Sequence, residues 1–293
     1  MIQAPDSNYR VLDNGSFVLA DSPTKPPDDV GGKKALRKEL KSVVAEISEL
    51  QRKMYADKRF ALLLVFQAMD AAGKDGTIRA VMSGVNPAGC HVSSFKAPSS
   101  EELGHDFLWR TVCKLPERGI IGIFNRSYYE EVLAVKVQPE FLASQNLPPE
   151  SVQTKNFDIW EQRYQSIIDH EEHLAHNGTI VLKFWLNVSR DEQKRRFLKR
   201  LTNPDRYWKF SKSDLSVRSR WHDYMGAYEQ LLNKTSTAHA PWYAIPADSK
   251  PWMRLVVARL IRDQIAGLPL AYPEKSADEI KQFGKYTEQL QAD

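Results

Sequence analysis

Residues 59–82 read "RFALLLVFQAMDAAGKDGTIRAVM". The run 59–66 is short, continuous and apolar, which is typical of a strand that is buried in a parallel sheet. A turn containing Gly73 and Gly76 follows, and "GTIRAVMSGV" then opens a helix. A phosphate-binding loop requires this order, because the start of a helix offers free N–H groups and a partial positive charge. The alternative is a chance strand-turn-helix that binds nothing.

Two residues depart from the usual phosphate-loop pattern G-x-x-x-x-G-K-[ST]. Ala68 occupies the first glycine position, where its methyl group is expected to crowd the turn, and Asp75 replaces the Ser or Thr after Lys74. We predict that Lys74 is catalytic and that its ammonium group reaches a phosphate oxygen. The remaining residues predicted to contact phosphate or nucleotide here are Ala71, Ala72, Gly73, Asp75, Gly76 and Thr77.

Asp70 is a carboxylate inside the same loop. A carboxylate beside a phosphate is unfavourable unless a divalent cation or an acceptor proton intervenes. We therefore predict that Asp70 is catalytic, either as a ligand of Mg²⁺, directly or through water, or by orienting the acceptor. The alternative is a carboxylate that only caps the next helix.

A second candidate site follows the apolar run "GIIGIF" (119–124), in the segment "NRSYYEEVL". A strand of this kind in a phosphate-loop enzyme usually ends in Asp to hold Mg²⁺, but here the residue is Asn125. Arg126 is predicted to be catalytic as a phosphate clamp, because guanidinium matches phosphate oxygens with paired hydrogen bonds; its alternative is a surface ion pair. Of the two following carboxylates, Glu130 and Glu131, we select Glu131 as a weaker metal- or acceptor-side candidate.

Residues 194–212 contain eight Lys or Arg and one acidic residue. Asn203-Pro204 breaks the preceding helix, so the basic stretch spans a helix end and a loop. This is the arrangement of a lid that closes over phosphates and excludes water, and we expect it at about 195–220. Some of its cations are expected to be solvated surface charges. The predicted ligand-binding lid residues are Arg196, Arg200, Lys209 and Lys212.

Strand and helix patterns alternate along the chain, which predicts an α/β fold with a parallel sheet covered on both faces. Ligands of such sheets bind beyond the carboxyl ends of the strands, where both candidate sites fall. Residues 1–32 are rich in Pro, Asp and Gly and are expected to form an extended arm, followed by a single domain over 33–293. Residues 99–112 are expected to form one helix whose start is capped by Ser99 and Glu102.

The composition is that of a globular protein, with 42% apolar and 27% charged residues. Cys90 and Cys113 are too few for a disulfide framework or a cysteine-rich zinc site, which favours a reducing compartment. Apolar runs are too short to span a membrane, and the N-terminus lacks a signal-peptide pattern. We therefore expect a cytoplasmic protein with neither membrane nor nucleic acid as a partner.

Five blocks together resemble the polyphosphate kinase 2 family over roughly 30–270: "QAMDAAGKDGTI", "SFKAPSSEELGHDFLWR", "GIFNRSYYEEVL", "DRYWKFSKSDL" and "STAHAPWYAIPADSK". The resemblance implies a P-loop kinase fold similar to thymidylate kinase, a three-layer α/β/α sandwich with a helical lid. Asp70 and Lys74 match the family's loop residues, and Asn125 and Arg126 match its second motif. Arg196, Arg200, Lys209 and Lys212 fall in its lid.

The resemblance further implies reversible phosphoryl transfer between inorganic polyphosphate and adenine nucleotides, with guanine nucleotides as an alternative. It implies Mg²⁺, with Mn²⁺ as the alternative ion, and a homodimer or homotetramer. "HDFLWR" and "FNRSYYEEVL" resemble the subgroup that uses both AMP and ADP, although Tyr128 replaces a common His of that subgroup. Two other functions stay open from the residues: an ATP-dependent nucleotide or small-molecule kinase, and a non-catalytic polyanion or nucleic-acid binder.

Overall fold

The centre of the molecule is a sheet of five parallel strands in the order β2-β3-β1-β4-β5. The computed structural model describes residues 2–149 and 158–293. The strands are β1 (Ala61–Gln67), β2 (Cys90–Ser94), β3 (Ile121–Asn125), β4 (Thr179–Asn187) and β5 (Trp242–Pro246).

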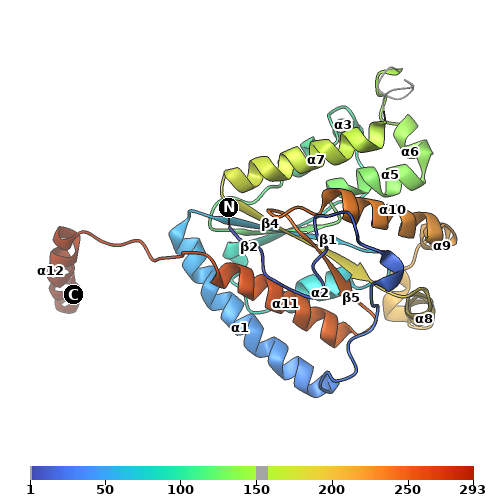
Figure 1. The fold of residues 1–293 in the computed structure, drawn as a ribbon. Coiled ribbons are helices and arrows are strands. Elements are labelled where there is room, and N and C mark those ends of the chain that lie inside the picture. The colour runs from blue at the N-terminus through green and yellow to red at the C-terminus, as the bar shows by residue number, and fades with distance from the viewer. Residues whose placement is uncertain (1, 150–157) are drawn as a thin grey trace.

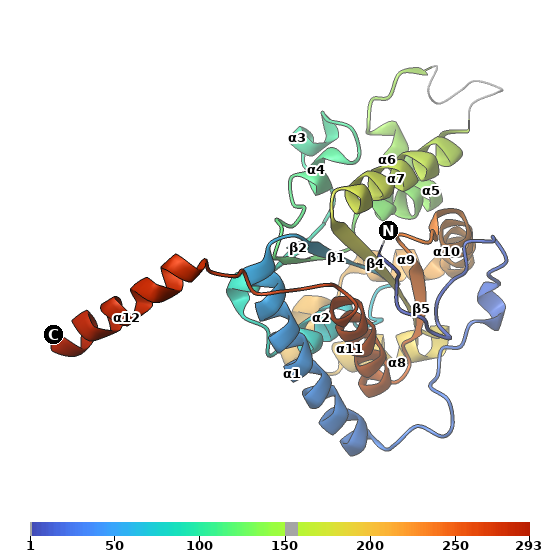
Figure 2. The same ribbon diagram turned by 60° about the vertical axis from the view of Figure 1, so that its left-hand side comes forward.

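Helices cover both faces of the sheet, as Figures 1 and 2 show. One layer contains α1 (Lys33–Asp57), α2 (Lys74–Val81) and α11 (Lys250–Ala266), and α1 and α11 pack closely together. The other contains α5 (Ala134–Val137), α6 (Pro139–Ala143), α7 (Ile159–His176) and α10 (Trp221–Thr235). This arrangement confirms the predicted three-layer α/β/α sandwich with a parallel sheet.

Strand β1 lies in the middle because its sequence is apolar throughout and all seven of its residues are buried. It pairs with β3 on one side and β4 on the other, and the register with β3 sets Phe66 opposite Asn125. The chain therefore leaves β1 and β3 side by side at the carboxyl edge of the sheet. Residues 68–73 and residues 125–126 meet there, although more than 50 residues separate them in the sequence.

Most of residues 2–32 lie outside regular secondary structure, and this N-terminal segment is packed against the body. The Val11 N–H donates to the Trp242 carbonyl at 2.9 Å, and the Ala244 N–H donates to the Tyr9 carbonyl at 2.8 Å. Val11 is buried, and a single turn, η1 (Leu19–Asp21), interrupts the extended path. The arm thus covers the β5 edge, which would otherwise expose unpaired backbone groups.

The helix expected over residues 99–112 is two short helices instead. The capping box of Ser99 and Glu102 is present and starts α3 (Ser100–Leu103). Gly104 then ends the helix, and the chain turns before α4 (Trp109–Val112) begins. The apolar spacing across this segment therefore belongs to two separate turns of helix, which pattern analysis does not distinguish from one.

Three short elements lie beyond the carboxyl ends of the strands: α8 (Arg190–Leu201), the 3₁₀ segment η5 (Pro204–Lys209) and α9 (Lys212–Ser219). The basic stretch that is predicted to act as a lid runs through these three elements, which are called the lid below. The last helix, α12 (Ala277–Ala292), was not predicted and projects away from the body (Figures 1 and 2). Within the described parts of the chain, no helix combines the length and apolarity needed to cross a bilayer.

Candidate active site

The loop after β1 has the backbone of an anion cradle. Gly73 adopts a φ of 115° immediately before α2, and Ala71 has a φ of 63°, which is unusual for a residue with a side chain. These left-handed residues turn the chain so that α2 starts next to the strand end. The first N–H groups of a helix lack intrahelical acceptors and carry a partial positive charge, so this turn suits phosphate oxygens.

Lys74 folds back over the loop, and its Nζ donates to the Ala68 carbonyl at 2.8 Å. Burial lowers the pKa of Lys74, as does the nearby Arg126, while the carboxylates around the loop oppose the shift. Ala68 has no left-handed φ and is buried in the apolar core. The backbone therefore does not require glycine at position 68, and the expected crowding by the methyl group stays a prediction.

Arg126 meets the loop from the end of β3. Its guanidinium lies 3.0 Å from Oδ1 of Asp70, and the two side chains are 40% and 20% exposed. The neighbouring charges of Glu130 and Asp70 raise the pKa of Arg126, so it remains cationic. The three residues predicted to be catalytic, Asp70, Lys74 and Arg126, thus lie around one point at the edge of the sheet.

Asn125 and Asp75 form a second contact across the same edge. The Asn125 amide donates to Oδ1 of Asp75 at 2.9 Å. Lys209 from η5 lies 4.0 Å from the other oxygen of Asp75, whose side chain is 71% exposed. This contact links the lid to the start of α2, so the lid lies over the loop.

The other predicted lid residues differ in role. Arg200 donates to the Lys209 carbonyl at 3.1 Å and lies 3.6 Å from Asp214 of α9. Arg200 therefore joins η5 to α9, while Lys212 is exposed at the first position of α9.

Arg196 is not on the lid surface. Its side chain is only 6% exposed, and the guanidinium donates to the carbonyls of Ala71, Ala72 and Ala247 and to Glu192. It lies beneath the loop and ties the loop backbone to the end of β5. The prediction that Arg196 contacts ligand is wrong, because its guanidinium N–H groups donate to acceptors within the protein. Arg196 supports the loop instead.

Glu131 is also directed away from the site. It is 7% exposed, its Oε2 accepts from Arg163 at 3.1 Å and from Gln145 at 2.6 Å, and burial raises its pKa. The segment η3 (Tyr128–Val132) sends Glu130 toward Arg126 and Glu131 into the α7 layer, which reverses the expected preference. The pattern of adjacent carboxylates gave no signal for which one faces the loop.

The hydroxyl of Thr77 donates to the Gly73 carbonyl at 3.0 Å, and the side chain is fully buried. Thr77 therefore stabilises the first turn of α2 from within. Among the other predicted loop residues, Ala71 and Gly73 provide the left-handed turn, Ala72 is buried, and Gly76 faces α11.

Two cationic residues on α11, Lys250 and Arg254, were not predicted from the sequence to lie near the loop. A Cβ placed on Gly76 would lie 3.0 Å from a terminal nitrogen of Arg254, and the buried Nε of Arg254 has no hydrogen-bond partner in the described chain. Lys250 lies one helical turn earlier, where burial and nearby arginines lower its pKa to about 8. The four-residue spacing of Lys250 and Arg254 on a helix that follows a strand end was the only sequence signal.

Asp214 is a further missed residue. Burial raises its pKa, and Asp70 acts in the same direction while Arg200 and Arg126 act against it. Asp214 therefore brings a second carboxylate near Asp70. The capping box that Asp214 forms with Ser211 was its only visible role in the sequence.

A cavity of about 440 Å³ opens beside the loop, between α2 and β2. Its size lies within the range of small-molecule sites. The lining mixes apolar and polar side chains: Asp75, Ile78, Arg79, Met82, Ser83, Val92, Ser94 and Asn125.

The donor set around the loop suits a weakly protein-bound Mg²⁺. Over residues 2–149 and 158–293, no three His, Cys, Asp or Glu side chains converge as a ready cation cage. Mg²⁺ usually keeps several waters and is held by one or two carboxylates plus substrate phosphates. Asp70, partly exposed beside the phosphate cradle, fits that requirement.

Comparisons with known proteins show the family of the chain. The family model described as "Polyphosphate kinase 2 (PPK2)" matches residues 31–270. An ADP-polyphosphate phosphotransferase of Rhodopseudomonas palustris is 49% identical over 96% of this chain and 97% of that protein. An AMP/ADP-polyphosphate phosphotransferase of Meiothermus ruber is 42% identical over 91% of this chain and 95% of that protein. A crystal structure of polyphosphate kinase 2 from Arthrobacter aurescens TC1 has a TM-score of 0.87 at 36% identity, covering 98% of both chains. This chain belongs to the polyphosphate kinase 2 family.

Proposed function

We propose that this protein transfers the terminal phosphoryl group of inorganic polyphosphate to ADP or AMP, and that it also runs in reverse. The observation that carries the proposal is the meeting of Lys74, Arg126 and Asp70 at a phosphate cradle beneath a basic lid. Two relatives that match nearly the whole chain carry names that give ADP, or AMP and ADP, as the nucleotides they act on.

Catalysis in this site is positioning plus charge stabilisation. The acceptor's terminal phosphate oxygen attacks the end phosphorus of polyphosphate in line, and the bond to the bridging oxygen breaks. The shortened polyphosphate leaves with that electron pair. Lys74 and Arg126 neutralise charge on the equatorial oxygens, and Asp70 orients the acceptor. Little covalent chemistry is required of the protein.

Mg²⁺, or Mn²⁺ in its place, would be held by Asp70 together with substrate phosphates. When bound, the ion would supply positive charge against the substrate phosphates. Asp70 is suited to this because it is the loop carboxylate, 20% exposed, and its partner Arg126 is itself a phosphate-binding group.

The number of cations around the loop favours a long polyanion over ATP as donor. Lys250 and Arg254 continue the positive surface from the lid onto α11, and Arg79 on α2 lies near Arg254. A nucleoside triphosphate needs fewer cations than this surface offers. We assign the α11 side to polyphosphate.

The cavity between α2 and β2 is assigned to the nucleotide acceptor. Ile78, Met82 and Val92 provide apolar contact for a base, while Asn125 and Asp75 lie at the end nearest the loop. An adenine nucleotide placed there would direct its phosphates toward Asp70. Guanine nucleotides remain the alternative acceptors for the same cavity.

The decisive assay incubates the protein with Mg²⁺ and long-chain polyphosphate, separately with ADP and with AMP, and resolves the nucleotides chromatographically. ATP is expected from ADP, and ADP followed by ATP is expected from AMP. If ATP alone phosphorylates an acceptor and no polyphosphate is formed or consumed, the protein is an ATP-dependent kinase instead. Salt-sensitive polyanion binding without turnover would support a non-catalytic binder.

Asp70→Asn and Lys74→Ala should each lower turnover at least about 10²-fold, the scale of losing one transition-state stabilising group. Matched controls are Asp169→Asn and Lys234→Ala, which change exposed residues on α7 and α10. Near-normal turnover of both loop variants, with folding intact by circular dichroism, would contradict the assigned roles.

A further inference from the structure

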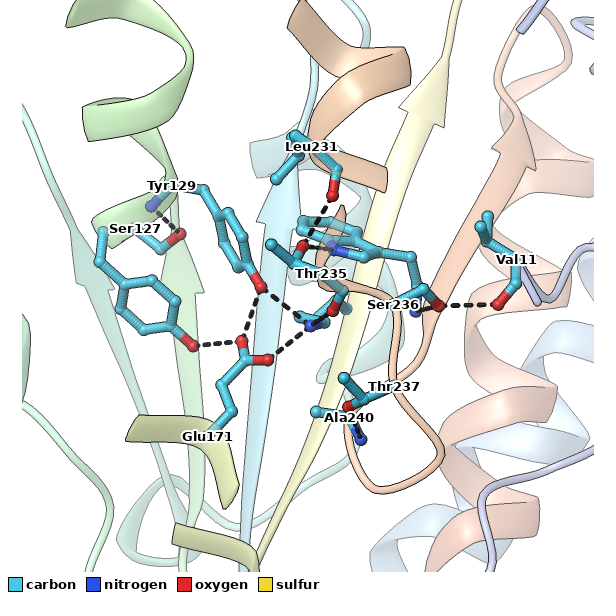
Figure 3. Close-up of polar contacts among 12 residues, drawn as sticks. Val11, Ser127, Tyr129, Glu171, Leu231, Thr235, Ser236, Thr237 and Ala240 are labelled. Carbon is cyan, nitrogen blue, oxygen red and sulfur yellow. Dashed lines mark hydrogen bonds and ion pairs between the residues drawn. The ribbon is translucent and has the colours of Figure 1, made fainter. Parts of the chain in front are cut away.

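An ion pair is buried in the core behind the active site. Lys183 lies in the middle of β4 and Glu171 on α7, and neither side chain is exposed. Their Nζ and Oε2 atoms are 2.5 Å apart, and Figure 3 shows the carboxylate of Glu171 directed into this cluster. The proposed phosphoryl-transfer mechanism does not use either residue directly.

Two tyrosines connect this pair to η3. The hydroxyls of Tyr128 and Tyr129 donate to the same Glu171 oxygen, Oε1, at 2.8 and 2.9 Å. Lys183 donates to the Tyr129 hydroxyl at 2.8 Å and to the Thr235 carbonyl at 2.7 Å (Figure 3). The ammonium group thus has three acceptors. Burial and the Glu171 charge raise the pKa of both phenols well above the ordinary value, so they remain donors.

Stability alone does not account for this arrangement. Removing two charges from water costs free energy that their attraction often only offsets, and apolar replacements of buried pairs are often neutral or stabilising. A buried polar network does, however, select one geometry, because any displacement leaves donors and acceptors unsatisfied. The question is which geometry this network selects.

The network holds the segment that begins with Arg126. Arg126 has a φ of 64°, an unfavourable conformation for a residue with a side chain, which persists only where its surroundings fix it. On one side, the Arg126 N–H donates to the Phe66 carbonyl at 3.1 Å. On the other, Ser127 caps η3 through the Tyr129 N–H and accepts from Gln67. The tyrosine hydroxyls then fix η3 to the buried pair.

We propose that Tyr129, together with the Lys183–Glu171 pair, acts as a positioning device that keeps the Arg126 guanidinium over the phosphate loop. The core network sets the path of η3, and the path of η3 sets the backbone conformation from which Arg126 reaches Asp70. This inference rests on the catalytic role proposed above for Arg126.

Tyr129→Phe removes the hydroxyl and leaves Lys183 paired with Glu171. We expect kcat for ATP formation from ADP and polyphosphate to fall about 10-fold, with little change in either KM, since a small displacement of a catalytic group lowers turnover. The matched control is Tyr243→Phe, which removes another largely buried hydroxyl, one that donates to the Pro5 carbonyl at 2.7 Å. It should lower the melting temperature similarly and leave kcat unchanged.

A double-mutant cycle with Arg126→Lys separates positioning from general destabilisation. If Tyr129 acts through Arg126, Tyr129→Phe lowers kcat in the wild-type background and has little further effect in Arg126→Lys. Equal fold losses in both backgrounds, or no loss in the wild type, would overturn the inference. Full activity of Arg126→Lys and of Arg126→Ala would instead refute the role of Arg126. If Tyr129→Phe does not fold, Tyr128→Phe takes its place in the same cycle.

Discussion

The two unusual residues of the phosphate loop have separate explanations. Ala68 has an ordinary backbone conformation, so glycine is not required there, and its carbonyl accepts from Lys74. In the usual pattern a Ser or Thr follows the loop lysine and an Asp ends the second strand, whereas here Asp75 follows Lys74 and the neutral Asn125 ends β3. The carboxylate stands at the start of α2 and the neutral group at the end of β3, and the two are hydrogen-bonded at 2.9 Å.

The lowered pKa of Lys250 predicts a pH response of the proposed active site. Burial, together with the charges of Arg196, Arg254 and Arg206, lowers its pKa to about 8, while Glu192 opposes the shift. The residue is therefore cationic below pH 8 and loses its charge as the pH rises through that value. Loss of this charge weakens attraction for a polyanion before polyphosphate binds.

We expect kcat/KM for polyphosphate to decline as the pH rises above about 8, because this parameter reports the free enzyme. In Lys250→Arg the side chain stays charged, so this decline should disappear while activity at pH 7 is largely retained. Initial rates at subsaturating polyphosphate between pH 6.5 and 9.5 measure the effect. An identical pH profile for both proteins would exclude Lys250 as its source.

At the scale of elements, the lid consists of α8, η5 and α9 held together by Arg200. Its η5 segment meets the loop through an exposed pair between Lys209 and Asp75 at 4.0 Å, whereas α8 holds the loop backbone from beneath through Arg196 and Gln193. Exposed pairs of this kind contribute little to stability. The substrate contact predicted for Lys209 would therefore cost little folding stability.

Lys209→Ala should lower kcat/KM for polyphosphate about 10-fold, the scale of one hydrogen bond to a charged group, and leave the melting temperature within about 2 °C of wild type. The loss should shrink at high salt, where screening weakens the contact. Lys234→Ala, another exposed and paired lysine, serves as the control and should change neither value. A comparable loss in the control would mean that overall charge, and not the lid contact, is responsible.

At the scale of the whole molecule, α12 lies outside the α/β/α sandwich. None of its residues is buried, and its exposed apolar side chains fall on one stripe: Ile280, Phe283, Tyr286 and Leu290. An exposed apolar stripe on a projecting helix is typical of an association surface. It is consistent with the proposed homodimer or homotetramer.

Deleting residues 273–293 should reduce the molar mass in solution to that of one truncated chain, which is below the 33.5 kDa of the full-length chain. The melting temperature of the body should change little, because α12 contributes no buried side chain. Light scattering coupled to size exclusion measures the mass. Ile280→Asp with Phe283→Asp should act like the deletion, whereas Lys281→Asp, which makes the same change in net charge on another face of the helix, should not. An unchanged mass in the deletion would remove α12 from the interface.

The sequence by itself determined the parts of this protein whose information is local. The apolar run of β1, the glycine turn and the start of α2 are contiguous, so pattern and turn chemistry predict the loop with Asp70 and Lys74. Arg126 was also predictable, because it follows a buried strand and parallel strands end at one edge. The family resemblance supplied the fold and the chemistry of the substrates.

Only the tertiary structure decided which side chains face the loop. Arg196 lies beneath it and Glu131 points into the α7 layer, although both have the residue types of a phosphate site. Lys250 and Arg254 reach it from a helix some 180 residues later. The physical reason is that residue type fixes what a group can bind, whereas its direction depends on packing and hydrogen-bond partners from distant segments. The buried pair of Lys183 and Glu171 exists only because the fold brings β4 against α7.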